Sequence, residues 1–354
     1  MRDDQGFARS VQVRLSRHAK AIGSDPNLVL TRYSVERFLY RLSRSPHGDR
    51  FVLKGALLML AWFGDALRPT RDADVLGFGN LDDDALIKIF SDVCKVEVEP
   101  DAMVYLPDTV RAEPIRVEDS YGGTRVMLAA ELGTARLRVQ VDVGIGDAVV
   151  PPPKWLEYPS LLDLPRPRLR AYCPETVIAE KLHAIAILGS RNSRMKDYFD
   201  LNALARAGVS DVSRLKEAVT ATFARRGTPV LNSWPVGLSD LFAQDPTKRA
   251  QWSAFLAKNR LTAPALDAAG TAQVKSPDVV PVPIRRSDWP TGVVPVSATP
   301  TSVLAMPFAG PPTAVKLPSY DRNWTTVLLG STSANPSGEP FCSPSTGKAN
   351  ESVP

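Results

Sequence analysis

A stretch in the middle of the chain alternates strictly between polar and apolar side chains. Over residues 136–143 every second residue is apolar, namely Leu137, Val139, Val141 and Val143. Successive side chains of an extended strand point to opposite faces, so this pattern predicts a strand with one buried face. The Gly133-Thr134 pair favours a turn before it, and residues 124–132 have the pattern of a partner strand. We therefore expect a hairpin within a larger sheet.

Other segments have the period of an amphipathic helix. Apolar residues recur at i, i+3, i+4 and i+7 over 33–43, which predicts a helix there. A second helix is expected over 51–63, followed by a short strand over 72–76. Helical periods then dominate from residue 174 to about 256. Together these patterns predict an α+β fold, a mixed sheet with flanking helices followed by a helical domain.

The composition changes near Leu261. Residues 262–354 contain nearly half of the 31 prolines and are rich in Ser, Thr, Ala and Gly, which is typical of a chain without a packed core. Pro151, Pro152 and Pro153 interrupt regular structure earlier. We expect three parts: a sheet domain over 1–150, a helical domain over 151–261 and a proline-rich tail of low order over 262–354. A chain ended near Leu261 is expected to remain active.

The charge and the absence of long apolar runs narrow the function class. No apolar run is long enough to span a membrane and the N-terminus lacks a secretory signal, so we expect a cytoplasmic protein with no membrane partner. The three cysteines have neither disulfide nor zinc spacing. A net charge of +5 fits an anionic partner such as RNA as well as an ordinary basic surface.

Two aspartates are the strongest candidates for a metal site. Asp72 and Asp74 stand at i and i+2 of the expected strand, so both side chains leave the same face and can share a cation. Mg²⁺ prefers such carboxylate oxygens and leaves positions open for substrate phosphates. Asp142, on the polar face of the alternating strand, is a candidate third ligand. The alternative is that the pair caps the next element and that Asp142 faces solvent.

A lysine interrupts the apolar stripe of the helix that follows Pro174. Lys181 lies among Val177, Ile178, Leu182 and Ile185, where a charge needs either an anion or a route to water. A triphosphate could supply the anion. The alternative is that the alkyl part of the Lys181 side chain lies on apolar surface while its ammonium group reaches water. On the first reading, Lys181→Met is expected to weaken NTP use and leave folding nearly unchanged. The neighbouring polar residues Glu180 and His183 are expected to be solvated.

Two more aspartates lie in an apolar stripe downstream. Asp197 and Asp200 share one helical face with leucines, which is unusual unless they pair with a cation. Either one can orient Lys181 in an internal clamp. The alternative is a surface pair between Lys196 and Asp200 at i and i+4.

Five segments follow one another along the chain: Phe51-Val-Leu-Lys-Gly-Ala-Leu, Arg68-Pro-Thr-Arg-Asp-Ala-Asp74, Val141-Asp142-Val143, Ala179-Glu-Lys-Leu-His-Ala184 and Arg194-Met-Lys-Asp-Tyr-Phe-Asp200. In order, spacing and residue types they resemble the AbiEii/AbiGii family of nucleotidyltransferase toxins, over roughly residues 7 to 260. The resemblance implies a DNA polymerase β-like nucleotidyltransferase domain at 1–150 and a toxin with a cognate antitoxin. Some members of this family add nucleotides to the 3′ end of tRNA.

The resemblance also implies roles for single residues. Asp72 and Asp74 would bind Mg²⁺, and Asp142 would complete the metal site or act as the base. The substrate would be an NTP, GTP or CTP by expectation, and the acceptor RNA, with tRNA expected. Lys181 would contact the triphosphate, and Asp197 would belong to the catalytic set. The remaining nucleotide-binding residues would be Lys54, Gly55, Thr70, Lys196 and Asp200.

The sequence also departs from the family pattern. The Gly-Ser that opens related transferase sites is Lys54-Gly55-Ala56 here, and a P-loop spacing is absent, which leaves the choice of nucleotide open. Gly55 can still let backbone N–H groups approach a triphosphate. Two rival functions remain: a regulatory module that binds NTP or RNA without transfer, and a metal-dependent nuclease using the same aspartates.

Overall fold

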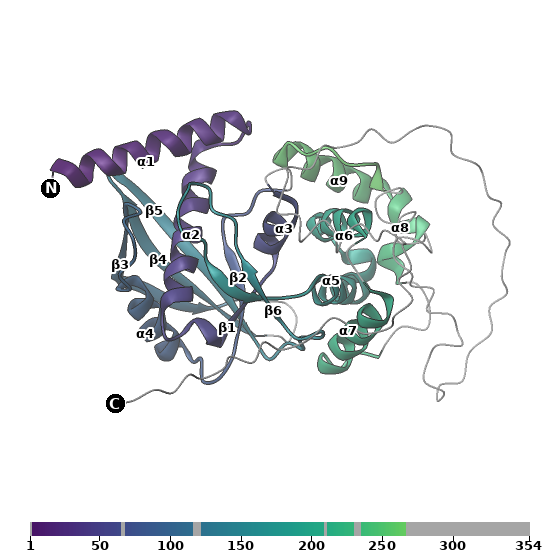
Figure 1. Ribbon diagram of the computed structural model, residues 1–354. Coiled ribbons are helices and arrows are strands. Elements are labelled where there is room, and N and C mark those ends of the chain that lie inside the picture. The colour runs from purple at the N-terminus through teal and green to yellow at the C-terminus, as the bar shows by residue number, and fades with distance from the viewer. Residues whose placement is uncertain (1, 65–67, 116–121, 209–210, 230–234, 267–354) are drawn as a thin grey trace, which may run out of the picture. The chain divides into compact units, whose positions relative to one another are not determined.

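The computed structural model describes residues 2–64, 68–115, 122–208, 211–229 and 235–266, and all of these lie in one compact unit (Figure 1). Within these ranges, strands and helices are mixed up to Ala171, and the elements after it are helical. The strands are β1 (Phe51–Lys54), β2 (Ala73–Gly77), β3 (Met103–Pro114), β4 (Gly123–Leu132), β5 (Ala135–Ile145), β6 (Lys154–Glu157) and β7 (Arg168–Ala171). The helices are α1 (Arg2–Ala21), α2 (Pro26–Arg44), α3 (Ala56–Phe63), α4 (Asp83–Cys94), α5 (Pro174–Leu188), α6 (Met195–Ala207), α7 (Val212–Arg225), α8 (Asp240–Gln244) and α9 (Pro246–Asn259), with short 3-10 turns η1 (Gly48–Arg50), η3 (Gly189–Arg191) and η4 (Val236–Leu238).

The described strands form one mixed sheet of seven strands in the order β3-β4-β5-β2-β1-β7-β6. The central strand β2 runs parallel to β5 and antiparallel to β1, and β1 runs parallel to β7. The remaining neighbours are antiparallel. The predicted α+β fold class, a mixed sheet with flanking helices followed by helices, is therefore confirmed.

Helices α2 and α4 cover one face of the sheet (Figure 1). The ring of Phe38 on α2 stacks on Phe90 of α4 at a centroid distance of 5.6 Å, and Phe51 of β1 meets Phe90 at 5.8 Å. The central apolar residues of β5, Val139, Val141 and Val143, are buried. On the opposite face Val52 and Leu76 are also buried, but Lys54, Asp74 and Asp142 are half-buried charged residues. The polar chemistry of the sheet therefore lies on that face.

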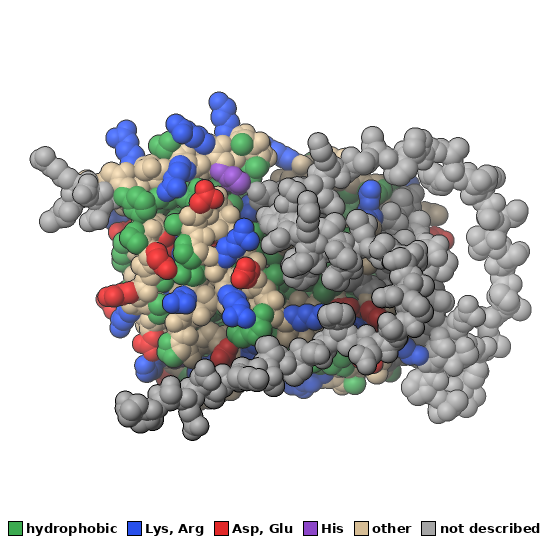
Figure 2. Space-filling model, in the orientation of Figure 1, with side chains coloured by type: hydrophobic (Ala, Val, Ile, Leu, Met, Phe, Trp, Pro, Cys, Tyr) green, Lys and Arg blue, Asp and Glu red, His purple; other side chains and the backbone are tan. Residues whose placement is uncertain are grey.

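Helix α1 is amphipathic from Ala8 to Lys20. Its buried residues Ala8, Val11, Leu15 and Ala19 recur at helical spacing and face the core. The Nε2 of Gln12 donates a hydrogen bond to the carbonyl of Leu132 and so ties α1 to β4. Lys and Arg side chains line the outer side of α1 (Figure 2), namely the exposed residues Arg9, Arg14, Arg17 and Lys20.

Most predicted elements are confirmed, with one error. The hairpin is formed by β4 and β5, the strand over 72–76 corresponds to β2, and the helix over 33–43 lies within α2. The predicted helix over 51–63 is wrong in its first part, because Phe51–Lys54 is strand β1 and only Ala56–Phe63 is helical. A short apolar run buried on both faces has no period of its own, so a buried strand and a buried helix look alike in sequence.

The helical part begins later than residue 151. Strands β6 and β7 extend the sheet as far as Ala171, and continuous helical structure starts with α5 at Pro174. Helix α5 packs on α6 and α7, and α6 packs on α9. Within the described residues no helix combines the length and apolar character needed to cross a membrane. The division at 150 and 261 stays a prediction, since buried apolar residues form one cluster from Val11 to Leu266.

The residues just after α9 belong to the packed part of the chain. The indole N–H of Trp252 donates to the carbonyl of Pro264 at 3.1 Å, and Leu266 is 3% exposed. The predicted tail of 262–354 therefore starts with residues that pack on the helices. The rest of it, 267–354, lies outside the described residues.

A chain ended after Leu261 should be less stable than one ended after Leu266. The shorter chain loses the buried side chain of Leu266 and leaves the Trp252 N–H without its acceptor, at a cost of about 2–4 kcal/mol in unfolding free energy. Urea denaturation of the two chains measures the difference. Equal midpoints would show that residues 262–266 contribute nothing to the fold.

Candidate active site

Four charged residues form a row across the open face of the sheet. The strand register places Lys54 opposite Asp74, Asp74 opposite Asp142, and Asp142 opposite Arg125. Directly opposed residues of neighbouring strands project from the same face. The two carboxylates therefore lie at the centre of the row with a cation at either end. Asp72 lies two residues before Asp74, immediately before β2 begins at Ala73.

The carboxylates of Asp72 and Asp74 repel each other. Burial and the negative charge of Asp72 raise the pKa of Asp74 from 3.8 to about 6, while the charges of Lys54 and Lys196 act in the opposite direction. The hydroxyl of Thr70 donates to Oδ1 of Asp72 at 2.9 Å, which fixes that carboxylate. A partly buried pair of carboxylates is a set of hard oxygen donors whose repulsion a divalent cation would remove. The two residues therefore fit Mg²⁺.

Gly55 lies directly against Asp74. Its backbone has φ of +70°, and a Cβ on Gly55 would come within 2.0 Å of Oδ2 of Asp74. Only glycine combines this conformation with such a close approach. Gly55, which the sequence predicts to bind nucleotide, is therefore needed to make room for the carboxylate of Asp74. Helix α3 starts immediately after it at Ala56.

Asp142 has a partner that the sequence did not indicate. Its two oxygens accept hydrogen bonds from Nε and Nη2 of Arg125, both at 2.9 Å, and the Gln140 amide lies 3.3 Å from Oδ1. Among the described residues no group of three or more His, Cys, Asp or Glu side chains is arranged to hold a metal ion. The expected third-ligand or base role of Asp142 stays a prediction, and it requires Arg125 to release the carboxylate.

Lys181 occupies an internal clamp. Its ammonium donates to Oδ1 of Asp197 at 2.9 Å and to Oδ2 of Asp200 at 2.7 Å. Asp200 also accepts two hydrogen bonds from Arg68, at 2.8 and 2.9 Å, and Arg194 lies 2.8 Å from Oδ2 of Asp197. The pairing of Lys181 with these aspartates is confirmed, and the reading of a solvated ammonium is wrong. The alternative pair of Lys196 with Asp200 is also wrong, since both oxygens of Asp200 are engaged elsewhere.

The clamp carries more positive than negative charge. Three cations, Lys181, Arg68 and Arg194, surround the two carboxylates of Asp197 and Asp200. Although burial opposes ionisation, the charges of Lys181 and Arg194 hold the pKa of Asp197 below its ordinary value. One positive charge is thus left over for a further anion.

The clamp and the Asp72–Asp74 pair interact through space. Burial lowers the pKa of Arg68, but the hydrogen bond and the negative charge of Asp200 outweigh this effect and raise it. The negative charge of Asp74 adds to the rise. The exposed Lys196 at the start of α6 acts on Asp74 as well. Arg68 of the clamp and Lys196 of α6 therefore present positive charge to Asp74.

A second cluster holds the other end of the charged row. Lys54 donates to Asp147 at 2.7 Å and to Glu180 at 3.3 Å, and Arg226 pairs with Asp147 at 3.0 Å. These contacts join β1 to helices α5 and α7. The expectation that Glu180 and His183 are solvated is wrong, because Glu180 belongs to this cluster and His183 is 5% exposed. Both lie off the apolar stripe of α5, but a second packed surface covers them.

Asp74→Asn should stabilise the metal-free protein near neutral pH. The folded protein binds a proton at Asp74 more tightly than the unfolded chain does, so this group's contribution to stability is present below pH 4 and is lost as the pH rises through about 6. We expect a gain of about 1–3 kcal/mol at pH 7.5 that shrinks toward pH 5. Urea titrations in EDTA measure it. An asparagine variant that is less stable at every pH would show that Asp74 is not under strain.

Paired carboxylates on a sheet, faced by a cationic clamp, are the arrangement that enzymes of phosphoryl and nucleotidyl transfer use. The family described as nucleotidyl transferase AbiEii toxin, type IV TA system, matches residues 37–273. The chain belongs to the AbiEii nucleotidyltransferase toxin family of type IV toxin–antitoxin systems. Membership implies an NTP substrate, a divalent metal and the context of a cognate antitoxin.

Two solved structures from Helicobacter pylori are similar to the chain. JHP933 is 17% identical, with 63% of this chain and 90% of that chain covered and a TM-score of 0.33. A second protein, assigned as a nucleotidyltransferase, is 18% identical, with 63% and 92% covered and a TM-score of 0.32. A comparison with curated proteins gives no match. Scores this low carry no structural argument, so the family assignment rests on the sequence match.

Proposed function

We propose that the protein transfers a nucleoside monophosphate from an NTP to the 3′ hydroxyl of an RNA, with tRNA as the expected acceptor. The observation that carries the proposal is the position of Asp72 and Asp74 beside the positive clamp of Lys181, Arg68 and Arg194. Family membership supplies the type of reaction, and the basic outer face of α1 suits a polyanionic acceptor.

The clamp is suited to a triphosphate. An ammonium group has three N–H donors, and Lys181 uses two of them on Asp197 and Asp200. The third is free for a phosphate oxygen in the proposed complex. Lys196 adds a second cation near Asp74, and Thr70, Lys54 and Gly55 complete the proposed nucleotide site. GTP and CTP are the nucleotides we expect.

Asp72 and Asp74 would hold Mg²⁺, which would neutralise the triphosphate charge and favour ionisation of the acceptor hydroxyl. Once Arg125 has released its carboxylate, Asp142 would either bind the metal together with Asp72 and Asp74 or accept the proton of the acceptor hydroxyl. In the transfer itself the 3′ oxygen of the RNA bonds to the α-phosphorus. The bond from that phosphorus to the α–β bridging oxygen breaks, and pyrophosphate leaves. Lys181 balances the negative charge that develops on the leaving group.

Two other functions would use the same residues differently. A regulatory module would bind NTP or RNA and leave both unchanged. A metal-dependent nuclease would use the aspartates but would have no need for a free donor on Lys181. The family assignment favours transfer over both.

Incubation of the protein with each of the four α-labelled NTPs, Mg²⁺ and total tRNA tests the proposal. We expect label to enter RNA with one NTP, and to enter no RNA whose 3′ terminal diol has been oxidised with periodate. The oxidised RNA is a matched control, since it differs only at the proposed acceptor group. Label retained on the protein, or transfer to oxidised RNA, would contradict a 3′ hydroxyl acceptor.

A further inference from the structure

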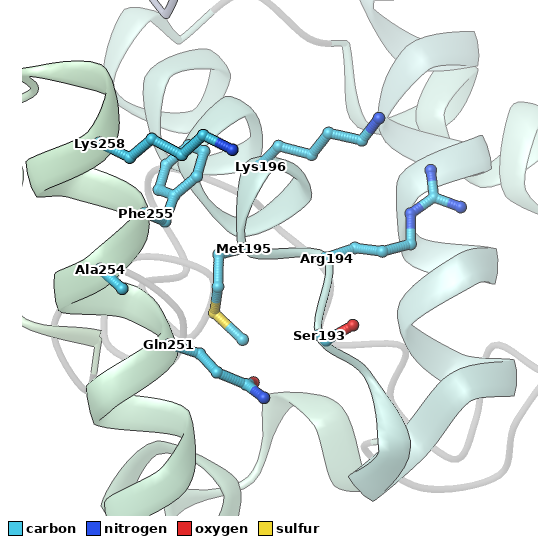
Figure 3. Close-up of a pocket in the computed structure, with 8 residues that line it drawn as sticks. All are labelled: Ser193, Arg194, Met195, Lys196, Gln251, Ala254, Phe255 and Lys258. Carbon is cyan, nitrogen blue, oxygen red and sulfur yellow. The ribbon is translucent and has the colours of Figure 1, made fainter.

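A shallow, open cavity of about 490 Å³ lies at the surface between the start of α6 and the second half of α9 (Figure 3). Its walls include Met195 and Lys196 from α6, and Gln251, Phe255 and Lys258 from α9. Cavities of this size accept ligands as large as a nucleotide. None of the α9 residues belongs to the site described above.

Gln251 brings a hydrogen-bond acceptor that lacks a donor. Its Oε1 atom is buried and has no hydrogen-bond partner anywhere in the part of the chain that the structure describes. Figure 3 shows the amide reaching from α9 toward the start of α6. A buried acceptor without a donor costs stability, so the Gln251 amide gains a hydrogen bond when it turns toward a donor on a ligand in the cavity.

Phe255 and Lys258 provide a ring and a cation. The ring of Phe255 is half-buried and is backed by Trp252 and Phe199, each at a centroid distance of 5.8 Å, which fixes its orientation. In Figure 3 the side chain of Lys258 extends from α9 toward α6. Lys258 is exposed and makes no ion pair with any residue in the described ranges. A fixed aromatic ring beside a free cation is the combination with which proteins bind single-stranded nucleic acid.

Two residues connect the cavity with the clamp. Lys196 and Arg194 both line the cavity, and in Figure 3 the ammonium of Lys196 extends away from α9. Nε of Arg194 lies 2.8 Å from Oδ2 of Asp197, whose Oδ1 accepts a hydrogen bond from Lys181. The cavity therefore adjoins the cationic clamp of the site where the transfer is proposed to occur.

We infer that this cavity holds the single-stranded end of the RNA acceptor, with a base on Phe255, a backbone phosphate on Lys258 and a ribose 2′ hydroxyl donating to Gln251. This assignment rests on the proposed function. A triphosphate is the poorer occupant, because the clamp around Lys181 places its cations beside the Asp72–Asp74 pair, whereas the α9 side of the cavity offers an aromatic ring and one exposed cation, Lys258. Stacking of one base and contact with one phosphate suit the single-stranded end of an RNA.

Fluorescence anisotropy with a labelled single-stranded RNA octamer tests the inference without requiring catalysis. We expect Lys258→Glu to weaken RNA binding at least about tenfold. Lys216→Glu, an exposed lysine of α7 outside the cavity, is the charge-matched control and should change binding less than about twofold. Binding of GTP, measured separately, should be the same in Lys258→Glu as in the unmodified protein.

Gln251→Met separates a binding role from a structural one. It removes the unpaired acceptor, so the melting temperature should not fall, whereas the preference for the RNA octamer over a DNA octamer of the same sequence should disappear. RNA binding within twofold of the unmodified protein in both Lys258→Glu and Gln251→Met would overturn the inference. So would a loss of GTP binding, which would assign the cavity to the nucleotide. An absence of label transfer would contradict the proposed function alone, since it leaves the binding result unchanged.

Discussion

Asp74→Asn should reduce nucleotidyl transfer by at least about a thousandfold while the fold stays intact. Asparagine has nearly the same shape but removes the charge that would bind a divalent cation. Asp72→Ala should have an effect of the same order, because the two carboxylates act as one donor pair. Label transfer at saturating NTP measures the loss, and the same substitutions should abolish toxicity in cells.

Asp108→Asn is the matched control for these variants. Asp108 is an exposed aspartate of β3 outside the site. It should retain full transfer, and all three variants should unfold cooperatively. Transfer by Asp74→Asn at the rate of the Asp108 control would remove the aspartate pair from the mechanism.

Lys181→Met should lower the unfolding free energy by about 3–5 kcal/mol. The sequence alone suggested a nearly neutral effect on folding, with loss confined to NTP use. The structure reverses that expectation, because Lys181 neutralises Asp197 and Asp200, whose side chains are 1% and 0% exposed. Removing the ammonium takes one hydrogen bond from each buried carboxylate and leaves Asp197 with only Arg194, whose side chain is 49% exposed.

A second substitution distinguishes lost pairing from lost packing. In the Lys181→Met background, Asp197→Asn removes the carboxylate that has lost its closest buried cation. It should therefore recover part of the stability, whereas the same change in the unmodified protein should destabilise it. Urea denaturation of the four proteins gives the coupling energy between the two sites. Additive effects would mean that Lys181 and Asp197 do not depend on each other.

Local pattern was sufficient to predict the elements with a clear period. The alternation over 136–143 identified β5, and two aspartates in an apolar stripe indicated the clamp with Lys181. Both inferences need only the periodicity of one element and the cost of burying a charge. The apolar run of β1 has neither the alternation of a half-buried strand nor the spacing of an amphipathic helix, so the sequence did not identify it as a strand.

The partners from distant segments could not be predicted. Arg125 pairs with Asp142 because β4 and β5 have a particular register, and Arg68 reaches Asp200 across 132 positions of sequence. The contacts of Lys54 with Asp147 and Glu180 likewise join a strand to a loop and a helix. One weak signal was available for Arg68, since it opens the segment that carries Thr70, Asp72 and Asp74. Asp147 and Arg226 offered none.

The fate of the α- and γ-phosphates of one NTP tests the central claim most directly. Parallel reactions with α-labelled and γ-labelled nucleotide, in the presence of Mg²⁺ and tRNA, should place the α label in RNA lengthened by nucleotide addition. The γ label should appear in pyrophosphate in equal amount, and Asp74→Asn should produce neither. Shortened RNA with intact NTP, or RNA and NTP that both remain unchanged despite binding, would contradict nucleotidyl transfer at the Asp72–Asp74 site.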